Sequence, residues 1–134
     1  MVYIHKNKKR TIHNLWLTAI SKSYWIKIKD GLVYSLSGFK FALREKPFRI
    51  ELAASSICLP IIILINRSAS EKAVLVFSLF LILITEVFNS AIEKALDKVS
   101  TKRHPLIKQA KDMASCAVFL SVINFIVMCV IILM

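Results

Sequence analysis

An uncharged run at the C-terminal end of the chain limits the folds that this sequence can adopt. Residues 113–134 contain no Asp, Glu, Lys or Arg. At about 1.5 Å per residue, a helix of this length crosses a hydrocarbon core of roughly 30 Å. Hydrophobic residues make up 57% of the 134-residue chain, a share too high for a soluble domain of this size. The sequence therefore predicts an all-α integral membrane protein.

Two further segments are apolar enough to enter a membrane. The uncharged run over residues 73–85 is short, but it continues without a helix breaker into a half that is polar on one side only. The run over residues 52–65 carries Pro60, which a membrane helix tolerates when its neighbours satisfy the freed carbonyl. The three predicted spans cover about residues 48–66, 71–97 and 112–134.

The segment before the first span has a different pattern. Between residues 30 and 44, apolar side chains recur at helical spacing, with Lys40 and Arg44 between them. This pattern is typical of a helix that lies in the membrane interface. We therefore expect an amphipathic surface helix over about residues 28–46. The basic start of the chain, residues 1–26, is expected to be partly disordered.

Two polar segments connect the predicted spans. Residues 65–72 form a tight turn, in which we expect Ser70 to cap the helix that follows. Residues 98–111 link the second and third spans. Within this link, the His104-Pro105 pair is expected to interrupt the helix, because proline disfavours the helical conformation of the residue before it.

Positive charge is concentrated on one side of the predicted membrane. Of the 19 Lys and Arg residues, 11 lie within residues 1–49 and 6 within residues 94–111, which leaves Arg67 and Lys72 between the first and second spans. By the positive-inside rule, the N-terminal arm and the second loop are cytoplasmic. Topology thus accounts for the formal net charge of +11, and we expect no nucleic acid partner.

One face of the second span carries acids where a membrane helix should have none. Glu86 follows thirteen uncharged residues, and a carboxylate at the centre of a membrane helix costs about 2.5–3.5 kcal/mol on insertion scales. One interpretation is a structural polar seam between helices. The other is a functional site whose charge is balanced by Lys94, by Lys111 or by a bound metal ion. At about 100° per residue, the face comprises Glu86, Asn89, Ser90, Glu93 and Asp97.

Other polar residues are expected to join this face at the cytoplasmic border. Asp112 and Ser115 lie one turn apart at the start of the third span, and we expect them to face the second span. Glu45 and Glu51 flank the turn where the surface helix should bend into the first span. Carboxylates that converge from separate helices beside basic residues suit Mg²⁺ bound together with phosphates.

The glycine count excludes the common nucleotide-binding loops. Gly31 and Gly38 are the only two glycines, so neither a Walker nor a Rossmann loop can be written from this sequence. Any nucleotide site must therefore use side chains. The three cysteines are scattered through apolar stretches, and we interpret them as packing residues.

Two segments closely resemble the signature of the small bacterial diacylglycerol kinase family. They are EVFNSAIE at residues 86–93, followed by Asp97, and AKDMASCAV at residues 110–118. The similarity extends upstream through Tyr34 and Glu45, and it covers the chain from about Lys27 to its C-terminus. This resemblance implies a membrane kinase domain over residues 27–134 after an unmatched extension. It also implies a homotrimer in the bacterial inner membrane, with a cytoplasmic N-terminus, which uses Mg²⁺ and ATP.

The resemblance assigns roles to individual side chains. Glu86 resembles the general base that accepts the proton of a lipid hydroxyl, while Glu45 and Glu93 resemble acids that bind the metal. In such a trimer, the base and the nucleotide groups can come from different protomers. The nucleotide side comprises Lys27, Tyr34, Glu45, Glu93, Asp97, Lys102, Arg103, His104, Lys111 and Asp112. The lipid side comprises Glu51, Asn89 and Ser115.

The lipid substrate leaves an alternative within the same family. Ser90, Glu51 and the run over residues 111–115 are more similar to the diacylglycerol branch, which makes phosphatidic acid, than to undecaprenol kinase. In the latter we would expect Thr and His at the first two positions. Lys27 in place of an arginine and Ala114 in place of a glycine depart from the family pattern. A non-enzymatic membrane assembly protein, or a transport protein with Glu86 as a proton-linked carboxylate, is the alternative from another class.

Overall fold

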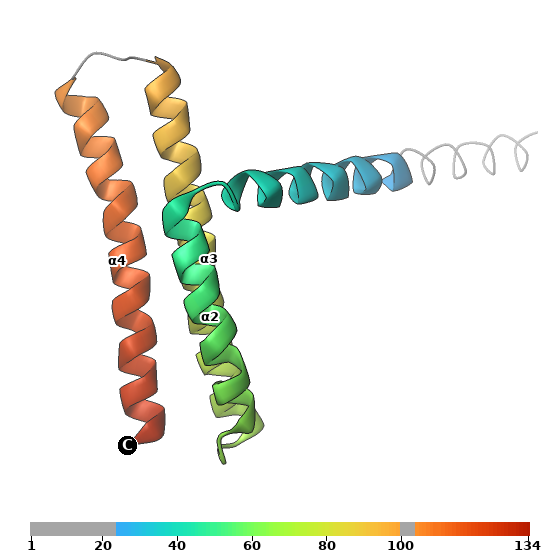
Figure 1. Ribbon diagram of the computed structural model, residues 1–134, viewed down its shortest axis with the longest axis vertical. Coiled ribbons are helices and arrows are strands. Elements are labelled where there is room, and N and C mark those ends of the chain that lie inside the picture. Colours follow the sequence, from blue (N-terminus) through green and yellow to red (C-terminus); the bar gives the residue numbers. More distant parts are fainter. Residues whose placement is uncertain (1–23, 100–103) are drawn as a thin grey trace, which may run out of the picture. The chain divides into compact units, whose positions relative to one another are not determined.

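The structure, a computed structural model, describes residues 24–99 and 104–134, and these residues form helices joined by short turns. Three of the helices are long and apolar enough to cross a membrane. The predicted all-α fold with three candidate spans is therefore confirmed. Helices are labelled in Figure 1, and the three spans are α2 (Lys46–Leu64), α3 (Ala69–Val99) and α4 (Pro105–Leu133).

A separate helix precedes the spans, as the sequence predicted. It covers residues 24–42 among those described. Its large apolar residues, Trp25, Leu32 and Phe39 among them, are exposed. The helix ends earlier than residue 46 because a turn at residues 43–45 follows it. Its amphipathic role at a membrane surface stays a prediction, and residues 1–23 lie outside the described part of the chain.

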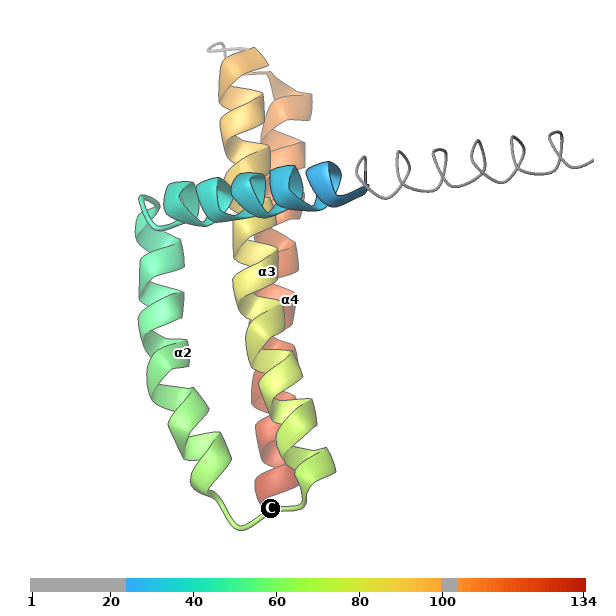
Figure 2. The same cartoon turned by 90° about the vertical axis from the view of Figure 1, so that its right-hand side faces the viewer.

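The three spans form an antiparallel arrangement built on α3. Both α2 and α4 pack against α3, and both run in the direction opposite to it (Figures 1 and 2). The start of α2, the end of α3 and the start of α4 consequently lie at one end of the bundle. We call this the charged end, because it carries Lys46, Arg49, Lys94, Lys98, Lys108 and Lys111.

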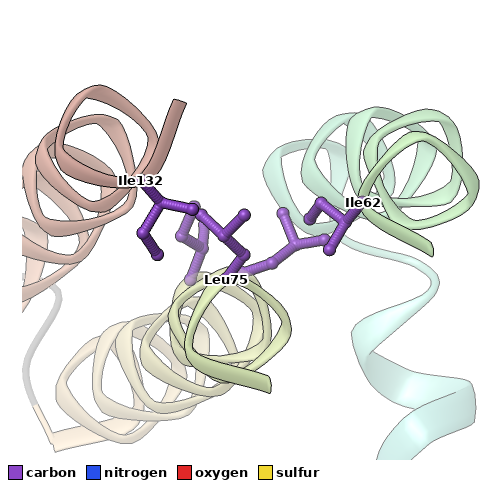
Figure 3. Packing of buried hydrophobic residues seen from close by; sticks show 5 residues of the cluster. Ile62, Leu75 and Ile132 are labelled. Carbon is purple, nitrogen blue, oxygen red and sulfur yellow. The ribbon is translucent and has the colours of Figure 1, made fainter. Parts of the chain in front are cut away.

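The hydrophobic core lies toward the opposite end. Leu75, Leu79 and Ile82 of α3 form its centre, with Ile62 of α2 and Ile132 of α4 on either side. Figure 3 shows the side chains of Ile62 and Ile132 directed toward Leu75. Most other large apolar residues of the three spans are exposed. Such a surface is appropriate for helices that face lipid or other protein chains.

The helix α3 begins with a reciprocal capping interaction. The Ser68 backbone N–H donates to Glu71 Oε2 at 2.8 Å, and the Glu71 backbone N–H donates to Ser68 Oγ at 3.3 Å. This is the Ser-x-x-Glu capping box. The prediction that Ser70 caps this helix is therefore wrong. The Ser70 hydroxyl instead lies 3.1 Å from that of Ser68.

At the end of the bundle that carries the turn between α2 and α3, Arg67 and Lys72 both bind backbone carbonyls of helix ends. Arg67 Nη2 donates to the carbonyl of Leu133 at 2.8 Å, and Lys72 Nζ donates to that of Ile63 at 2.7 Å. The last carbonyls of a helix have no partner within it, and they form the negative end of its dipole. The turn between α2 and α3 thus satisfies the carboxyl ends of α2 and α4.

The start of α4 shows that the link between the last two spans is shorter than predicted. His104 precedes the helix, and its Nδ1 accepts a hydrogen bond from the Leu106 backbone N–H at 3.3 Å. Pro105 follows in the first turn, where its missing N–H costs nothing. The predicted interruption at His104-Pro105 is confirmed. The helix begins well before residue 112, however, so Lys108 and Lys111 are helical.

Replacing Ser68 with alanine should destabilise the bundle more than the same change at Ser70. An N-cap serine stabilises its helix by about 0.5–2 kcal/mol, whereas the Ser70 hydroxyl contacts only that of Ser68 among the described residues. The measurement is the unfolding midpoint of Ser68→Ala and Ser70→Ala in detergent micelles. A midpoint that falls equally or further in Ser70→Ala would contradict the capping box.

Candidate functional site

The polar face of α3 runs from the interior of the bundle to its charged end. Glu86 is only 3% exposed, and Asn89 and Ser90 are also buried. Further along the helix, Glu93 is half-buried and Asp97 is exposed. The Ser90 hydroxyl donates a hydrogen bond of 3.1 Å to Glu86 Oε1, one turn earlier. At about 1.5 Å per residue, Glu93 lies roughly 10 Å further along the axis than Glu86. The face thus connects a buried carboxylate with exposed charged groups.

Three other carboxylates interact electrostatically with Glu86. Glu51, in the second turn of α2, lies within electrostatic range of the Glu86 carboxylate. Glu93 and Glu45 lie within the same range of it. Glu45 immediately precedes α2 and is its N-cap residue by position, although its side chain makes no capping hydrogen bond. The antiparallel packing of α2 on α3 therefore gathers four acids at one end of the bundle.

Two buried acceptor atoms of this group have no partner within the described part of the chain. They are Oε2 of Glu51 and Oδ1 of Asn89. A buried polar atom without a hydrogen bond costs about 1–3 kcal/mol. Such atoms are usually paired with water, a ligand or another chain. Both atoms can accept a hydrogen bond from a hydroxyl group that enters between α2 and α3.

Lysines pair with the acids at the outer part of the face. Lys94 Nζ lies 2.8 Å from Glu45 Oε1, which joins α3 to the turn before α2. Lys111 pairs with Asp97, which joins α4 to α3. The two lysines that the sequence offered as balancing cations thus each contact an acid of the site. Their partners come from other elements, which sequence spacing did not indicate.

The face of α4 that packs on α3 differs from the predicted one. Ala114 is buried, whereas Asp112 and Ser115 are exposed. Asp112 instead pairs with Lys108, one turn earlier on the same helix. The prediction that Asp112 and Ser115 face α3 is therefore wrong. This orientation of α4 is accompanied by the Lys111–Asp97 pair and by the small buried side chain of Ala114, and small residues let membrane helices approach closely.

A hydroxyl pair that the sequence analysis missed joins the middle of α3 and α4. Thr85 Oγ1 and Ser121 Oγ lie 2.9 Å apart, and Ser121 is only 3% exposed. Thr85 immediately precedes Glu86, so this contact fixes the part of α3 that carries the buried carboxylate. The available signal was the presence of hydroxyl residues within the two apolar runs, Ser78 and Thr85 in one and Ser115 and Ser121 in the other, because such residues often bond across membrane helices.

The structure tests no nucleotide role for five of the predicted residues. Lys27 and Tyr34 are exposed on the helix over residues 24–42. Lys102 and Arg103 belong to the undescribed residues. His104 caps α4. The roles of these residues toward a nucleotide stay predictions.

The acids present fit a metal ion that arrives with phosphates. Among the described residues, no group of three or more His, Cys, Asp or Glu side chains could hold a metal by itself. Mg²⁺ usually takes only one or two carboxylates, together with phosphate and water oxygens. Glu45 and Glu93, both within electrostatic range of Glu86, supply this number.

The fold and the site define a class of protein: an integral membrane protein in which three spans gather acids and lysines at one end. The chain belongs to the prokaryotic diacylglycerol kinase family, whose pattern it matches over residues 33–133. The predicted family is thereby confirmed. Residues 1–32 precede the match, so the predicted border near residue 27 lies somewhat before it.

Several curated relatives carry the name diacylglycerol kinase. The protein from Pseudomonas aeruginosa is 42% identical over 96 residues, which cover 71% of this chain and 78% of that one. The protein from Helicobacter pylori is 38% identical over 98 residues, covering 72% and 77% of the two chains. The protein from Haemophilus influenzae is 35% identical over 89 residues, covering 66% and 75%. The chain is therefore similar to kinases along most of their length.

A larger side chain should be tolerated at residue 115 but not at residue 114. Ala114→Leu forces three extra carbon atoms into the contact between α4 and α3, and overpacking of this kind costs about 1–3 kcal/mol. Ser115 is exposed in the protomer, so Ser115→Leu should cost less. Unfolding midpoints of the two variants in micelles test the orientation of α4. A larger loss for Ser115→Leu would contradict it.

Proposed function

We propose that the protein is an ATP-dependent diacylglycerol kinase of the bacterial inner membrane. It transfers the γ-phosphate of ATP to the hydroxyl of diacylglycerol and yields phosphatidic acid and ADP. The observation that supports this proposal best is the burial of Glu86 among membrane spans, on a face that leads directly to paired acids and lysines. A lipid alcohol and a charged nucleotide need these two environments side by side.

The buried part of the face suits the lipid acceptor. Glu86 takes the proton of the diacylglycerol hydroxyl as general base, and the hydroxyl oxygen attacks the γ-phosphorus. A new P–O bond forms while the bond from the γ-phosphorus to the β-phosphate oxygen breaks, and ADP leaves with those electrons. The acceptor atoms of Glu51 and Asn89 orient the lipid through hydrogen bonds, since both are buried without a partner in the described chain.

The charged end suits the nucleotide. Phosphoryl transfer depends mainly on alignment and on neutralising the phosphate oxygens. Mg²⁺, held by Glu45 and Glu93, would supply part of that positive charge when bound. Lys111 supplies a further positive charge at the end of α3, where Asp97 positions it. The positive-inside rule places this end in the cytoplasm, where ATP is available.

Undecaprenol kinase activity is the second candidate, and a two-lipid assay separates the two. The purified chain is given diacylglycerol and undecaprenol with labelled ATP, and the products are separated by thin-layer chromatography. We expect faster labelling of diacylglycerol, in line with Ser90 and Glu51 and with the names of the similar proteins. Faster labelling of undecaprenol would show that undecaprenol is the preferred substrate. Labelling of neither lipid would refute the proposed function.

Glu86→Gln should lower kcat for lipid phosphorylation by about 10²-fold or more, because loss of a general base typically costs 10²–10⁴-fold. The amide keeps the shape of the side chain, so the protein should still fold. The matched control is Glu71→Gln, which neutralises a carboxylate of the same helix at its opposite end. Full activity of Glu86→Gln at normal expression would refute the assignment of the base.

Removal of divalent cations with EDTA should abolish the activity, and added Mg²⁺ should restore it. The reason is that the described acids leave most of the coordination of the metal to phosphate oxygens, so that metal and nucleotide depend on each other. The measurement is the rate of lipid labelling against free Mg²⁺ concentration. A rate that is unchanged in EDTA would exclude the proposed role of Glu45 and Glu93.

A further inference from the structure

Lys94 has a defined contact at the site but no part in the proposed reaction. Its Nζ lies 2.8 Å from Glu45 Oε1, so it joins the last third of α3 to the turn before α2. The Lys94 side chain is 61% exposed, whereas that of Glu45 is 29% exposed. The carboxylate is thus held in the bundle, and the ammonium reaches it from the solvent side.

The ammonium of Lys94 binds Oε1 of Glu45, an oxygen that a metal ion at this carboxylate would also bind. Glu45 is one of the two acids that the proposed function gives to Mg²⁺. A divalent cation and an ammonium on one carboxylate repel each other strongly at such short distances. Exposed ion pairs are also weak, since water competes for both partners. The lysine stem is flexible, so the ammonium can withdraw into solvent without disturbing α3.

The other charges around Glu45 explain why a cation is needed before the metal arrives. Glu45 lies within electrostatic range of Glu86, near which Glu51 and Glu93 also lie. Without a counter-ion, these carboxylates would repel one another and push Glu45 away from α3. Among the described residues, the pair of Glu45 with Lys94 is the one ion pair that these four carboxylates form.

We propose that Lys94 is a positioning residue that holds Glu45 in place in the metal-free protein and is displaced from it by Mg²⁺. The inference rests on the proposed function for the identity of the metal-binding acid. Lys94 and the metal compete for the same carboxylate. Lys94 therefore lowers the affinity of the empty site for a divalent cation while keeping Glu45 oriented toward α3.

The test is direct binding of Mn²⁺, which prefers the same oxygen ligands as Mg²⁺. Free Mn²⁺ is measured by electron paramagnetic resonance during titration of the purified full chain in uncharged micelles, without nucleotide. We expect Lys94→Gln to bind Mn²⁺ about two- to fivefold more tightly than the unmodified chain, as the loss of an exposed competing ion pair implies. The matched control is Lys98→Gln, which removes the same charge one turn further along α3 and should have a smaller effect.

The Glu45→Gln variant, which lacks the carboxylate for which Lys94 and the metal compete, separates this competition from a general effect of charge. In Glu45→Gln the competition is absent, so adding Lys94→Gln to it should leave Mn²⁺ affinity nearly unchanged. Lys94→Arg keeps the pair and should resemble the unmodified chain. Binding by Lys94→Gln alone, with none detected in the unmodified chain, supports the inference as well.

Equal Mn²⁺ affinity of Lys94→Gln and Lys98→Gln would overturn the inference, as would binding by neither Lys94→Gln nor the unmodified chain. So would the same gain from Lys94→Gln in the Glu45→Gln background. These outcomes are independent of lipid labelling. A chain that binds Mn²⁺ as expected but phosphorylates no lipid would refute the proposed function and leave the competition at Glu45 standing.

Discussion

The whole arrangement depends on the fact that a membrane interior offers no hydrogen-bond partners to a polar group. Hydroxyls in the interior of the second span accordingly bond to the protein itself: Ser78 donates to the carbonyl of Leu75, and Thr85 to that of Leu81. Glu86 differs in kind, because its contacts with the Ser90 hydroxyl and the Asn89 side chain bring no positive charge to a buried carboxylate. A membrane helix keeps a carboxylate only where a ligand, a cavity or another polar group interacts with it. Glu86 is therefore the residue around which the candidate site is built.

The two ends of the bundle handle charge in opposite ways. At the end with the α2–α3 turn, Arg67 and Lys72 bind backbone carbonyls, and Glu71 serves the first turn of α3. These three charged side chains therefore form hydrogen bonds with backbone groups at helix ends. At the charged end, lysines and acids pair with one another, and one partner of each pair is largely exposed. Such pairs are weak and exchangeable, so a multiply charged ligand can rearrange them without unfolding a helix.

The sequence predicted what depends on composition along the chain and failed where the choice lay between two similar residues or between the faces of a helix. Long uncharged runs fixed the spans, and the prediction for the His104-Pro105 break was confirmed because proline acts locally. The cap of α3 was misplaced, since both Ser68 and Ser70 are capable and only the position of Glu71 selects the former. The orientation of α4 was also wrong. Helical spacing says which residues share a face, but not which face meets the neighbouring helix, and here that face carries Lys111 and Ala114.

The corrected orientation of α4 bears on how many chains build one site. Asp112 and Ser115 carry expected roles toward nucleotide and lipid, yet both are exposed on the protomer and lie off the face that packs on α3. Glu86, by contrast, is buried within its own protomer. One protomer thus leaves these two side chains outside the contact between α3 and α4. In the homotrimer that the family resemblance implies, they are available to a neighbouring copy. The largely exposed apolar surface of the spans leaves room for such neighbours.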